Sequence, residues 1–290
     1  MKLGWNGAVV DGQAAAVSVF DHGFLYGIGL FETFRAYGGR PFLLDRHLGR
    51  LAEGCARLGI RYQPDEEQMR RHIADVLEAN GLRDAYIRLS VSAGVASLGV
   101  YEGEYECPNV AVYVKPLPPL NDELYETGKP LQLLKTRRNL PETDIRLKSF
   151  HYINNRMAKR ELLQYPWAVN AEGLFLSAQG YLAEGIVSNL FFVEDGELCT
   201  PAADTGILAG ITRERVLEIA AEAGIPANEG FYDWERLTRA EEVFLTNSIQ
   251  EIVPVTSLYD MDGRRYGIGA GKIGAMTKRL LQRYRAETLR

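Results

Sequence analysis

The sequence predicts an α+β protein of two domains, and three observations favour this class. Its 290 residues are 46% hydrophobic and 24% charged, which is ordinary globular composition and enough chain for two cores. Strand-like and helix-like patterns segregate instead of alternating strictly, unlike the pattern of a doubly wound sheet. A proline-rich stretch, 115–130, interrupts both patterns. We therefore expect an N-terminal domain over 1–117, a linker over 118–130 and a C-terminal domain over 131–290.

The N-terminal domain is expected to begin with hairpins. "WNGAVVDG" and "LFETFRAYGGRPFLL" contain Asn-Gly and Gly-Gly, which supply the positive φ angles of a tight turn. Two amphipathic helices follow, "RHLGRLAEGCARLGI" with Asp45 as its expected cap, and "PDEEQMRRHIADVLEANG" between Asp65 and Gly81. "AYIRLSVSAG" and "NVAVYVKPL" have the alternation of strands.

The C-terminal domain is expected to be richer in strands. We expect one near "LQLLKTRRN", several through "GLFLSAQGYLAEGIVSNLFFVEDGELCTP" with a turn at Asp195 and Gly196, and another at "EVFLTNS". Helices are expected over "NNRMAKRELLQ", from "GITRERVLEIAAEAG", and at the end over "GKIGAMTKRLLQRYR".

Composition argues against several classes of function. A formal net charge of −5 gives no basic surface for nucleic acid. No apolar run approaches the roughly 20 residues of a membrane span, and no secretory signal is evident, so we expect a soluble cytoplasmic protein. Cys55, Cys107 and Cys199 lie far apart, which suggests neither a disulfide framework nor a CxxC pair, and the four histidines form no HExxH motif. We expect no metal site.

Glycine-rich segments suggest where a phosphate would bind. "GAGKIG", 269–274, matches GxGxxG but follows a polar turn and leaves too little chain for a βαβ unit, so we do not expect a dinucleotide there. "TGILAGITRERV" leads into a helix whose first N–H groups favour an anion, with Thr212 as a further donor, although it also fits a simple helix cap. "LTNSIQEIVP" sets Ser248 where a strand ends, a place for ligand contacts or an ordinary turn.

Three charged residues have open interpretations at this stage. Glu184 lies in the apolar stretch "YLAEGIVSNLFFV", either buried against a cation such as a protonated pyridine or facing water. Arg50 would serve as a phosphate clamp or a surface salt bridge. Lys148, in "DIRLKSFHYINN", is either a solvated charge or an amine that attacks a carbonyl to form an imine.

The combination of segments resembles the class IV pyridoxal-phosphate enzymes, which include branched-chain aminotransferases, D-amino-acid aminotransferases and 4-amino-4-deoxychorismate lyases. The resemblance spans nearly the whole chain through "FDHGFLYGIGLFETFR", "FLLDRHLGRL", "RLKSFHYINN", "YLAEGIVSNLFF", "DTGILAGITRE" and "LTNSIQEIVP". It implies a smaller N-terminal α/β domain, a larger β-rich C-terminal domain with helices, bound pyridoxal 5′-phosphate and a small-molecule substrate. It also implies a homodimer, with the site between the domains and near the partner chain.

The resemblance also implies residue roles. Lys148 would be the Schiff-base lysine and general base, Glu184 would face the pyridine nitrogen, and Thr33 would assist proton transfer. Further cofactor contacts would come from Arg50, Asn189, Ile211, Thr212 and Ser248, and substrate contacts from Tyr26, Phe31, Arg35, Tyr86 and Arg88.

Within the group, the chain looks most similar to the 4-amino-4-deoxychorismate lyases, which form 4-aminobenzoate and pyruvate for folate biosynthesis. Thr33 stands where branched-chain enzymes typically have glycine, and Ile153 where they usually have tyrosine. The alternative is an aminotransferase for a D-amino acid, a branched-chain amino acid or an (R)-amine, favoured by Tyr86 and Arg88 in "AYIRLSVSAG". A third class is a non-catalytic or regulatory protein that keeps the fold.

Overall fold

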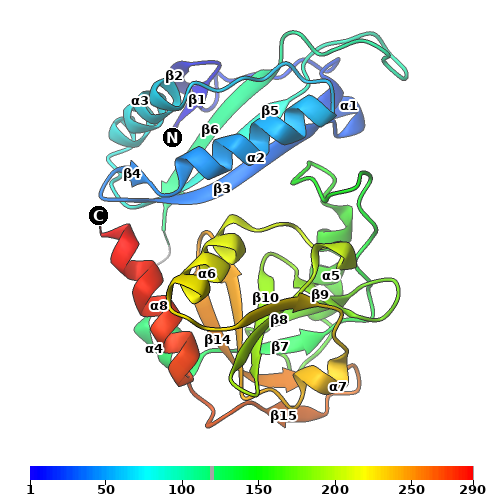
Figure 1. The fold of residues 1–290 in the computed structure, drawn as a ribbon. Helices are drawn as coiled ribbons and strands as arrows, with labels where there is room; N and C mark the ends of the chain where they lie inside the picture. Colours follow the sequence, from blue (N-terminus) through cyan, green and yellow to red (C-terminus); the bar gives the residue numbers. More distant parts are fainter. Residues whose placement is uncertain (118–120, 290) are drawn as a thin grey trace. The chain divides into compact units, whose positions relative to one another are not determined.

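The computed structural model describes residues 1–117 and 121–289, which fold into two compact units (Figure 1). Unit 1 is Met1–Pro119 with Leu147–His151, and unit 2 is Leu120–Arg146 with Tyr152–Arg290. The segment with Lys148 therefore belongs to unit 1, although the residues before and after it belong to unit 2. The expected linker, 118–130, starts outside the described residues, and its described part contains helix α4 (Asp122–Thr127) and the start of strand β7 (Lys129–Leu133).

Unit 1 is built on a six-stranded antiparallel sheet in the order β2-β1-β6-β5-β3-β4 (Figure 1). Its strands are β1 (Lys2–Trp5), β2 (Ala8–Asp11), β3 (Gly29–Tyr37), β4 (Arg40–Pro41), β5 (Ala85–Ser92) and β6 (Asn109–Pro116). Both expected hairpins are confirmed, because Asn6-Gly7 and Gly38-Gly39 have the positive φ angles of tight turns.

Three helices accompany this sheet: α1 (His22–Tyr26), α2 (Leu44–Arg57) and α3 (Glu66–Ala79). The expected start of α3 at Asp65 is confirmed, and the Asp65 carboxylate caps the helix by accepting a hydrogen bond from the Gln68 N–H at 2.7 Å. The expected cap of α2 is wrong. That helix starts two residues earlier than this cap implies, after Leu43 in the left-handed conformation (φ 52°), so Asp45 lies inside its first turn.

Unit 2 contains a nine-stranded sheet that closes on itself (Figure 1). Strands β10, β13, β14, β7, β8 and β9 pair in turn, and β9 pairs again with β10 through Glu184 opposite Asn189. The strands besides β7 are β8 (Glu172–Leu176), β9 (Leu182–Gly185), β10 (Asn189–Glu194), β11 (Glu197–Pro201), β12 (Ala227–Gly230), β13 (Glu242–Asn247), β14 (Glu251–Tyr259) and β15 (Arg265–Gly267). The ring thus closes at two residues that the resemblance places beside a cofactor.

The helices of unit 2 pack around its sheet, and the last of them, α8, is the final element of the chain. They are α4, α5 (Ile153–Leu162), α6 (Ile211–Glu222), α7 (Trp234–Leu237), α8 (Ala275–Thr288) and the 3₁₀ turn η1 (Ala203–Thr205). The three longer ones, α5, α6 and α8, are those expected from the sequence. The α+β class of the chain is therefore confirmed.

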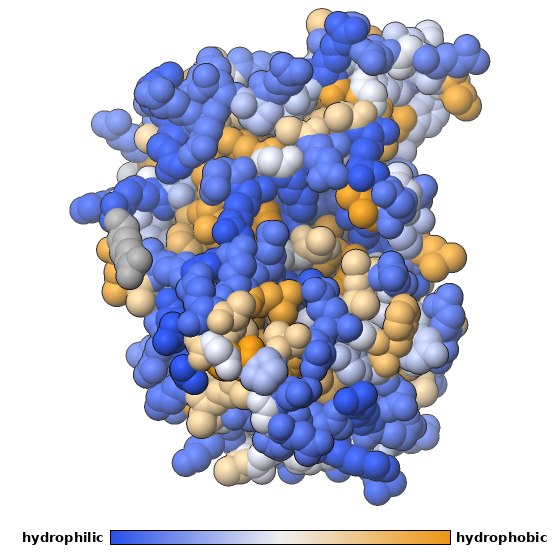
Figure 2. All heavy atoms as spheres, viewed as in Figure 1, coloured by the Kyte–Doolittle hydropathy of each residue, from blue (hydrophilic) through white to orange (hydrophobic). Residues whose placement is uncertain are grey.

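The visible face is mainly hydrophilic, with smaller groups of hydrophobic residues between (Figure 2). Within the described residues, no helix is both long and apolar enough to cross a bilayer. The same residues contain no cluster of three or more His, Cys, Asp or Glu side chains arranged to hold a metal ion.

Candidate active site

The candidate residues form two groups, one in each unit. Unit 1 holds Lys148, Arg50, Thr33 and the expected substrate contacts, whereas unit 2 holds Glu184, Asn189, Ile211, Thr212 and Ser248. Each group is described by itself.

Lys148 is held against the edge of β3 by backbone hydrogen bonds. The Phe31 N–H donates to the Lys148 carbonyl at 2.9 Å, and the Phe150 N–H donates to the Gly29 carbonyl at 2.9 Å. A side chain at position 29 would overlap the Phe150 ring, so glycine is required for this close approach. The Lys148 Nζ lies 4.8 Å from the centre of the Phe31 ring. Lys148 is therefore half-buried at a fixed place and is not a freely solvated charge.

Five of the expected residues share one face of the sheet. In the pairing of β3 with β5, Phe31 lies opposite Ser90, Thr33 opposite Arg88 and Arg35 opposite Tyr86. Because side chains alternate along a strand and paired residues point to the same side, all of these lie on one face. On the opposite face of β3, Leu30 and Phe34 enter the hydrophobic core, with Glu32 between them in the sequence.

Arg88 is placed beside the same ring as Lys148. Its guanidinium carbon lies 3.6 Å from the centre of the Phe31 ring, and its Nε donates to the Ser90 hydroxyl at 3.1 Å. Two cations therefore contact one aromatic side chain, on the sheet face that also carries Thr33. Tyr26 lies elsewhere in unit 1, in α1, where its hydroxyl accepts a hydrogen bond from the Gly99 N–H at 3.0 Å.

Arg50 forms a buried ion pair, which replaces the surface salt bridge considered from sequence. Its Nε and Nη2 donate to the two carboxylate oxygens of Glu32 at 2.8 and 2.7 Å. The Nδ1 atom of His47 lies 2.6 Å from the same carboxylate, which is 1% exposed. Glu32 and His47 were assigned no role from the sequence, because nothing in their spacing shows that β3 and α2 bring them to Arg50.

Burial and charge determine the protonation of this cluster. Burial opposes ionisation of Glu32, but the charge of Arg50 and the hydrogen bond from His47 outweigh it and hold the Glu32 pKa at about 2. Burial lowers the pKa of His47 below its usual value. Glu32 is therefore ionised and His47 neutral near pH 7, and the negative charge fixes the orientation of Arg50.

Glu32→Gln is expected to lower stability in a pH-dependent way. Since the folded-state pKa lies below the ordinary value of 4.5, ionised Glu32 stabilises the protein above about pH 4.5, and this contribution disappears as the pH falls toward 2. The shift corresponds to about 3 kcal/mol, at roughly 1.4 kcal/mol per pKa unit. Urea unfolding at a series of pH values should show a large difference between wild type and variant at pH 7, shrinking below pH 4.5.

Glu104→Gln is the matched control for this prediction. Glu104 is exposed and pairs with the exposed Arg61, so its loss should cost less than about 1 kcal/mol at any pH. Equal effects of the two substitutions at pH 7 would show that the buried cluster does not stabilise unit 1.

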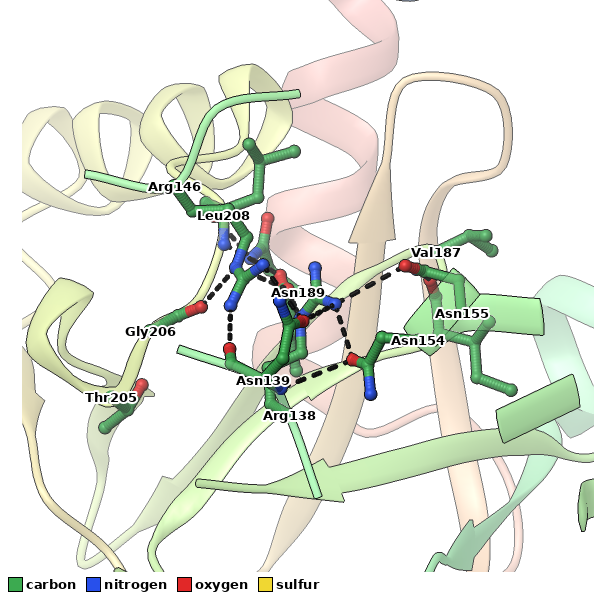
Figure 3. Close-up of polar contacts among 12 residues, drawn as sticks. Arg138, Asn139, Arg146, Asn154, Asn155, Val187, Asn189, Thr205, Gly206 and Leu208 are labelled. Carbon is green, nitrogen blue, oxygen red and sulfur yellow. Dashed lines mark hydrogen bonds and ion pairs between the residues drawn. The ribbon is translucent and has the colours of Figure 1, made fainter. Parts of the chain in front are cut away.

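In unit 2, Glu184 is enclosed by hydrogen-bond donors, among them Arg138 and Asn189, which Figure 3 labels. Its carboxylate accepts from Arg138 Nε at 2.7 Å, from the Leu208 N–H at 3.0 Å and from Asn189 Nδ2 at 3.3 Å. The side chain is buried, which makes the water-facing alternative wrong. Arg138 is itself oriented by Asn154, whose Oδ1 accepts from Nη1 at 2.8 Å. Sequence reasoning missed Arg138, which is buried in the fold beside Glu184.

A second arginine increases the positive charge at this place (Figure 3). The Nε of Arg146 lies 3.9 Å from Glu184 Oε1 and donates to the Gly206 carbonyl at 2.5 Å. Burial and the neighbouring charge of Arg138 lower the pKa of Arg146 to about 10, so it remains charged near pH 7. Two arginine side chains, Arg138 and Arg146, therefore lie beside the Glu184 carboxylate.

The start of α6 has the features of an anion site. Gly210 is its N-cap and supplies no side-chain acceptor, and a side chain there would collide with Asn189 Oδ1. The Thr212 and Ser248 hydroxyls lie 3.3 Å apart. Opposite Asn189 on β13, the buried Thr246 hydroxyl has no hydrogen-bond partner within the described residues. Backbone N–H groups and hydroxyls at a helix start are suited to a phosphate.

The GxGxxG match at 269–274 directly precedes helix α8, and the first N–H groups of that helix already donate to a side chain of the protein. Glu242 Oε1 accepts from the Met276 N–H at 3.0 Å, and its Oε2 accepts from the Thr277 N–H at 2.8 Å. A carboxylate of the protein thus takes the place that a nucleotide phosphate would need at the start of α8.

Comparison with known proteins identifies the family. The model for amino-transferase class IV matches residues 29–258, a range that contains Lys148, Glu184 and Ser248. The chain belongs to the class IV aminotransferase family.

Individual relatives include both lyases and aminotransferases. The chain is 41% identical to the aminodeoxychorismate lyase of Bacillus subtilis, over 92% of this chain and 89% of that protein. It is 38% identical to a putative branched-chain-amino-acid aminotransferase of Methanocaldococcus jannaschii, over 98% and 96%. Among solved structures it resembles the 4-amino-4-deoxychorismate lyase of Pseudomonas aeruginosa, with a TM-score of 0.84, 31% identity and coverage of 98% of each chain.

Proposed function

We propose that the protein is a pyridoxal-phosphate-dependent 4-amino-4-deoxychorismate lyase, which converts aminodeoxychorismate to 4-aminobenzoate and pyruvate. Its similarity to lyases over nearly the whole length supports this assignment. The observation that carries it is the placement of Thr33, a proton donor, on the sheet face that also presents Phe31, beside the Lys148 amine.

The residues of unit 2 fit pyridoxal phosphate. A carboxylate has about four acceptor positions, and protein donors fill three at Glu184, so one remains for the N–H of a pyridinium ring. The uncapped start of α6, with Thr212 and Ser248, fits a phosphate group. We assign both groups of candidate residues to one such cofactor, with Arg50 as a further phosphate ligand.

When bound, pyridoxal phosphate supplies an electron sink for carbanion chemistry. Lys148 would hold the cofactor covalently through its carbonyl carbon, and the free Lys148 Nζ would take the C4 proton of the substrate. The Glu184 carboxylate would accept a hydrogen bond from the N–H of the cofactor ring. The Thr33 hydroxyl donates a proton to the departing pyruvate portion. The products are aromatic 4-aminobenzoate and pyruvate, and aromatisation makes the elimination favourable.

Substrate binding is assigned to the basic and aromatic face of the unit 1 sheet. Aminodeoxychorismate carries carboxylates, for which Arg35 and Arg88 are suitable partners, and an unsaturated ring, for which Phe31 and Tyr86 are suitable. Tyr26 is assigned a further substrate contact.

We also propose that the protein acts as a homodimer in the cytoplasm. Two adjacent exposed segments of unit 1 support a second copy as partner. Residues 97–99 are tied to α1 by hydrogen bonds from the Gly99 N–H to Tyr26 and between His22 Nε2 and the Ser97 carbonyl at 3.0 Å. Around these contacts Phe24, Leu98 and Val100 are exposed, and burying such apolar side chains favours association. Sedimentation of the purified chain measures the oligomeric state.

Product analysis tests the lyase assignment. We expect aminodeoxychorismate to yield pyruvate and 4-aminobenzoate in equal amounts without an added keto acid, because a lyase leaves no nitrogen on its cofactor. Thr33→Gly should slow this reaction on the order of 10²-fold, with little effect on cofactor affinity, since it removes a proton donor. Thr33→Ser, which keeps the hydroxyl, should retain most of the rate.

The aminotransferase remains the second candidate, because a putative branched-chain aminotransferase is nearly as similar as the lyase. Complete conversion of the cofactor to the pyridoxamine form by D-alanine, L-leucine or an aromatic (R)-amine, with no pyruvate from aminodeoxychorismate, would establish that function instead. Bound cofactor without turnover of any amine would indicate a non-catalytic protein.

A further inference from the structure

The turn between β13 and β14 contains Ser248 and ends in a backbone conformation that is unfavourable by itself. Asn247 Oδ1 accepts from the N–H groups of Ile249 and Gln250 at 2.9 and 2.7 Å, which shapes the turn. The chain then enters β14 through Glu251, which is in the left-handed region with φ 62°. That conformation costs a residue with a side chain about 1 kcal/mol or more. Surrounding contacts must compensate for this cost.

Arg285, in the last helix, provides such contacts. Its Nε donates to Glu251 Oε2 at 2.6 Å, and the carboxylate belongs to a residue that is only 2% exposed. The guanidinium carbon lies 4.1 Å from the centre of the Tyr125 ring, and the Tyr125 hydroxyl donates to the Gln250 carbonyl at 3.2 Å. Arg285 thus contacts two side chains that hold the turn, one by an ion pair and one by stacking.

We propose that Arg285 is a positioning residue for phosphate binding, which acts through Glu251 and Tyr125 to hold Ser248 beside Thr212. This inference rests on the proposed function, which assigns Ser248 and Thr212 to the cofactor phosphate. Without Arg285, the buried Glu251 carboxylate loses its ion-pair partner, and the left-handed conformation loses its support. The turn then relaxes, and the Ser248 hydroxyl moves from its place 3.3 Å from Thr212.

Comparing two ligands isolates the phosphate contribution. Pyridoxal phosphate and pyridoxal share the ring and the carbonyl, and they differ in the phosphate group. Titration calorimetry of the full chain stripped of cofactor would give the affinity for each. Arg285→Ala should weaken pyridoxal phosphate binding by about tenfold or more, the loss of roughly one good hydrogen bond, and leave pyridoxal binding within about twofold. Arg285→Lys, which keeps the charge without the stacking, should fall between wild type and Arg285→Ala.

Two further variants separate positioning from general stability. Arg283→Ala changes an exposed arginine on the same helix and should leave both affinities unchanged. If Arg285 acts through Ser248, the double variant Ser248→Ala with Arg285→Ala should bind pyridoxal phosphate little more weakly than Ser248→Ala alone. Additive losses, or equal weakening of both ligands, would overturn the inference.

The inference and the proposed function fail in different ways. If wild type binds pyridoxal phosphate no better than pyridoxal, the phosphate assignment is wrong and the premise is lost. If wild type discriminates between the two ligands and Arg285→Ala and Arg285→Lys keep the wild-type ratio, Arg285 has no positioning role. Should Arg285→Ala fail to fold, the ratio measured for Arg285→Lys decides the question.

Discussion

Lys148→Arg is expected to abolish the reaction while leaving the fold intact. Arginine keeps the positive charge beside the Phe31 ring, and the backbone hydrogen bonds that hold position 148 to β3 do not depend on the side chain. A guanidinium neither forms an imine nor accepts a proton near neutral pH. Because both roles are lost, product formation should fall by at least about 10⁴-fold.

Two measurements check this prediction independently of turnover. Borohydride reduction of the wild-type protein should fix the cofactor to the peptide that contains Lys148, and no such label should form in Lys148→Arg. Lys159→Arg, at an exposed position on α5, is the control and should behave as wild type. A labelled peptide other than that of Lys148 would move the covalent link to another lysine and remove the basis of the proposed function.

Glu184→Gln is expected to have the second-largest effect. The side chain keeps its size but loses its charge, so the ring nitrogen is no longer held protonated, and the rate should fall on the order of 10² to 10³-fold. The amide also places an NH₂ group where only acceptors fit, since Arg138, Asn189 and the Leu208 N–H are all donors. Unit 2 should lose on the order of 3 kcal/mol, because Arg138 remains buried without its anionic partner.

The kinetic pattern distinguishes these two consequences. Loss of ring protonation lowers kcat at saturating cofactor, whereas a loosened site raises the concentration of cofactor needed for saturation. Glu229→Gln is the control, because Glu229 pairs with Arg213 in the same unit but is half exposed. A wild-type kcat in Glu184→Gln would mean that this carboxylate does not face the ring nitrogen.

The sequence was most informative where local chemistry determines structure. The turn at Asn6-Gly7 and the helix start at Asp65 depend on residues within a few positions, and both were predicted correctly. The Asp45 cap was wrong because the left-handed Leu43 precedes the helix, which therefore starts two residues early, and no pattern indicates that conformation. Strand β14 was not predicted, because Pro254 disfavours a strand by itself. The pairing with β7 begins only after it, at Val255.

The site depended on contacts distant in sequence. The family motifs indicated Lys148, Glu184 and Thr212, but not the residues that determine their charge and orientation. Arg138 lies 46 positions from Glu184, and Arg50 lies 18 positions from Glu32. Such ion pairs result from strand pairing and helix packing, which composition and periodicity do not specify. The sequence therefore indicated the reactive groups but not the side chains that position them.

The return of Leu147–His151 to unit 1 has a consequence for biosynthesis. A nascent chain that ends near residue 119 has every strand of the first sheet, but nothing yet covers the edge of β3 at Gly29 and Phe31, where Lys148 and Phe150 will bind. An open strand edge is a template for pairing with other chains, and it stays open until the ribosome has made the first strand of unit 2 as well. Cutting the gene at the apparent boundary would therefore separate Lys148, the proposed Schiff-base lysine, from the sheet that positions it, whereas a fragment extended to residue 151 would retain both.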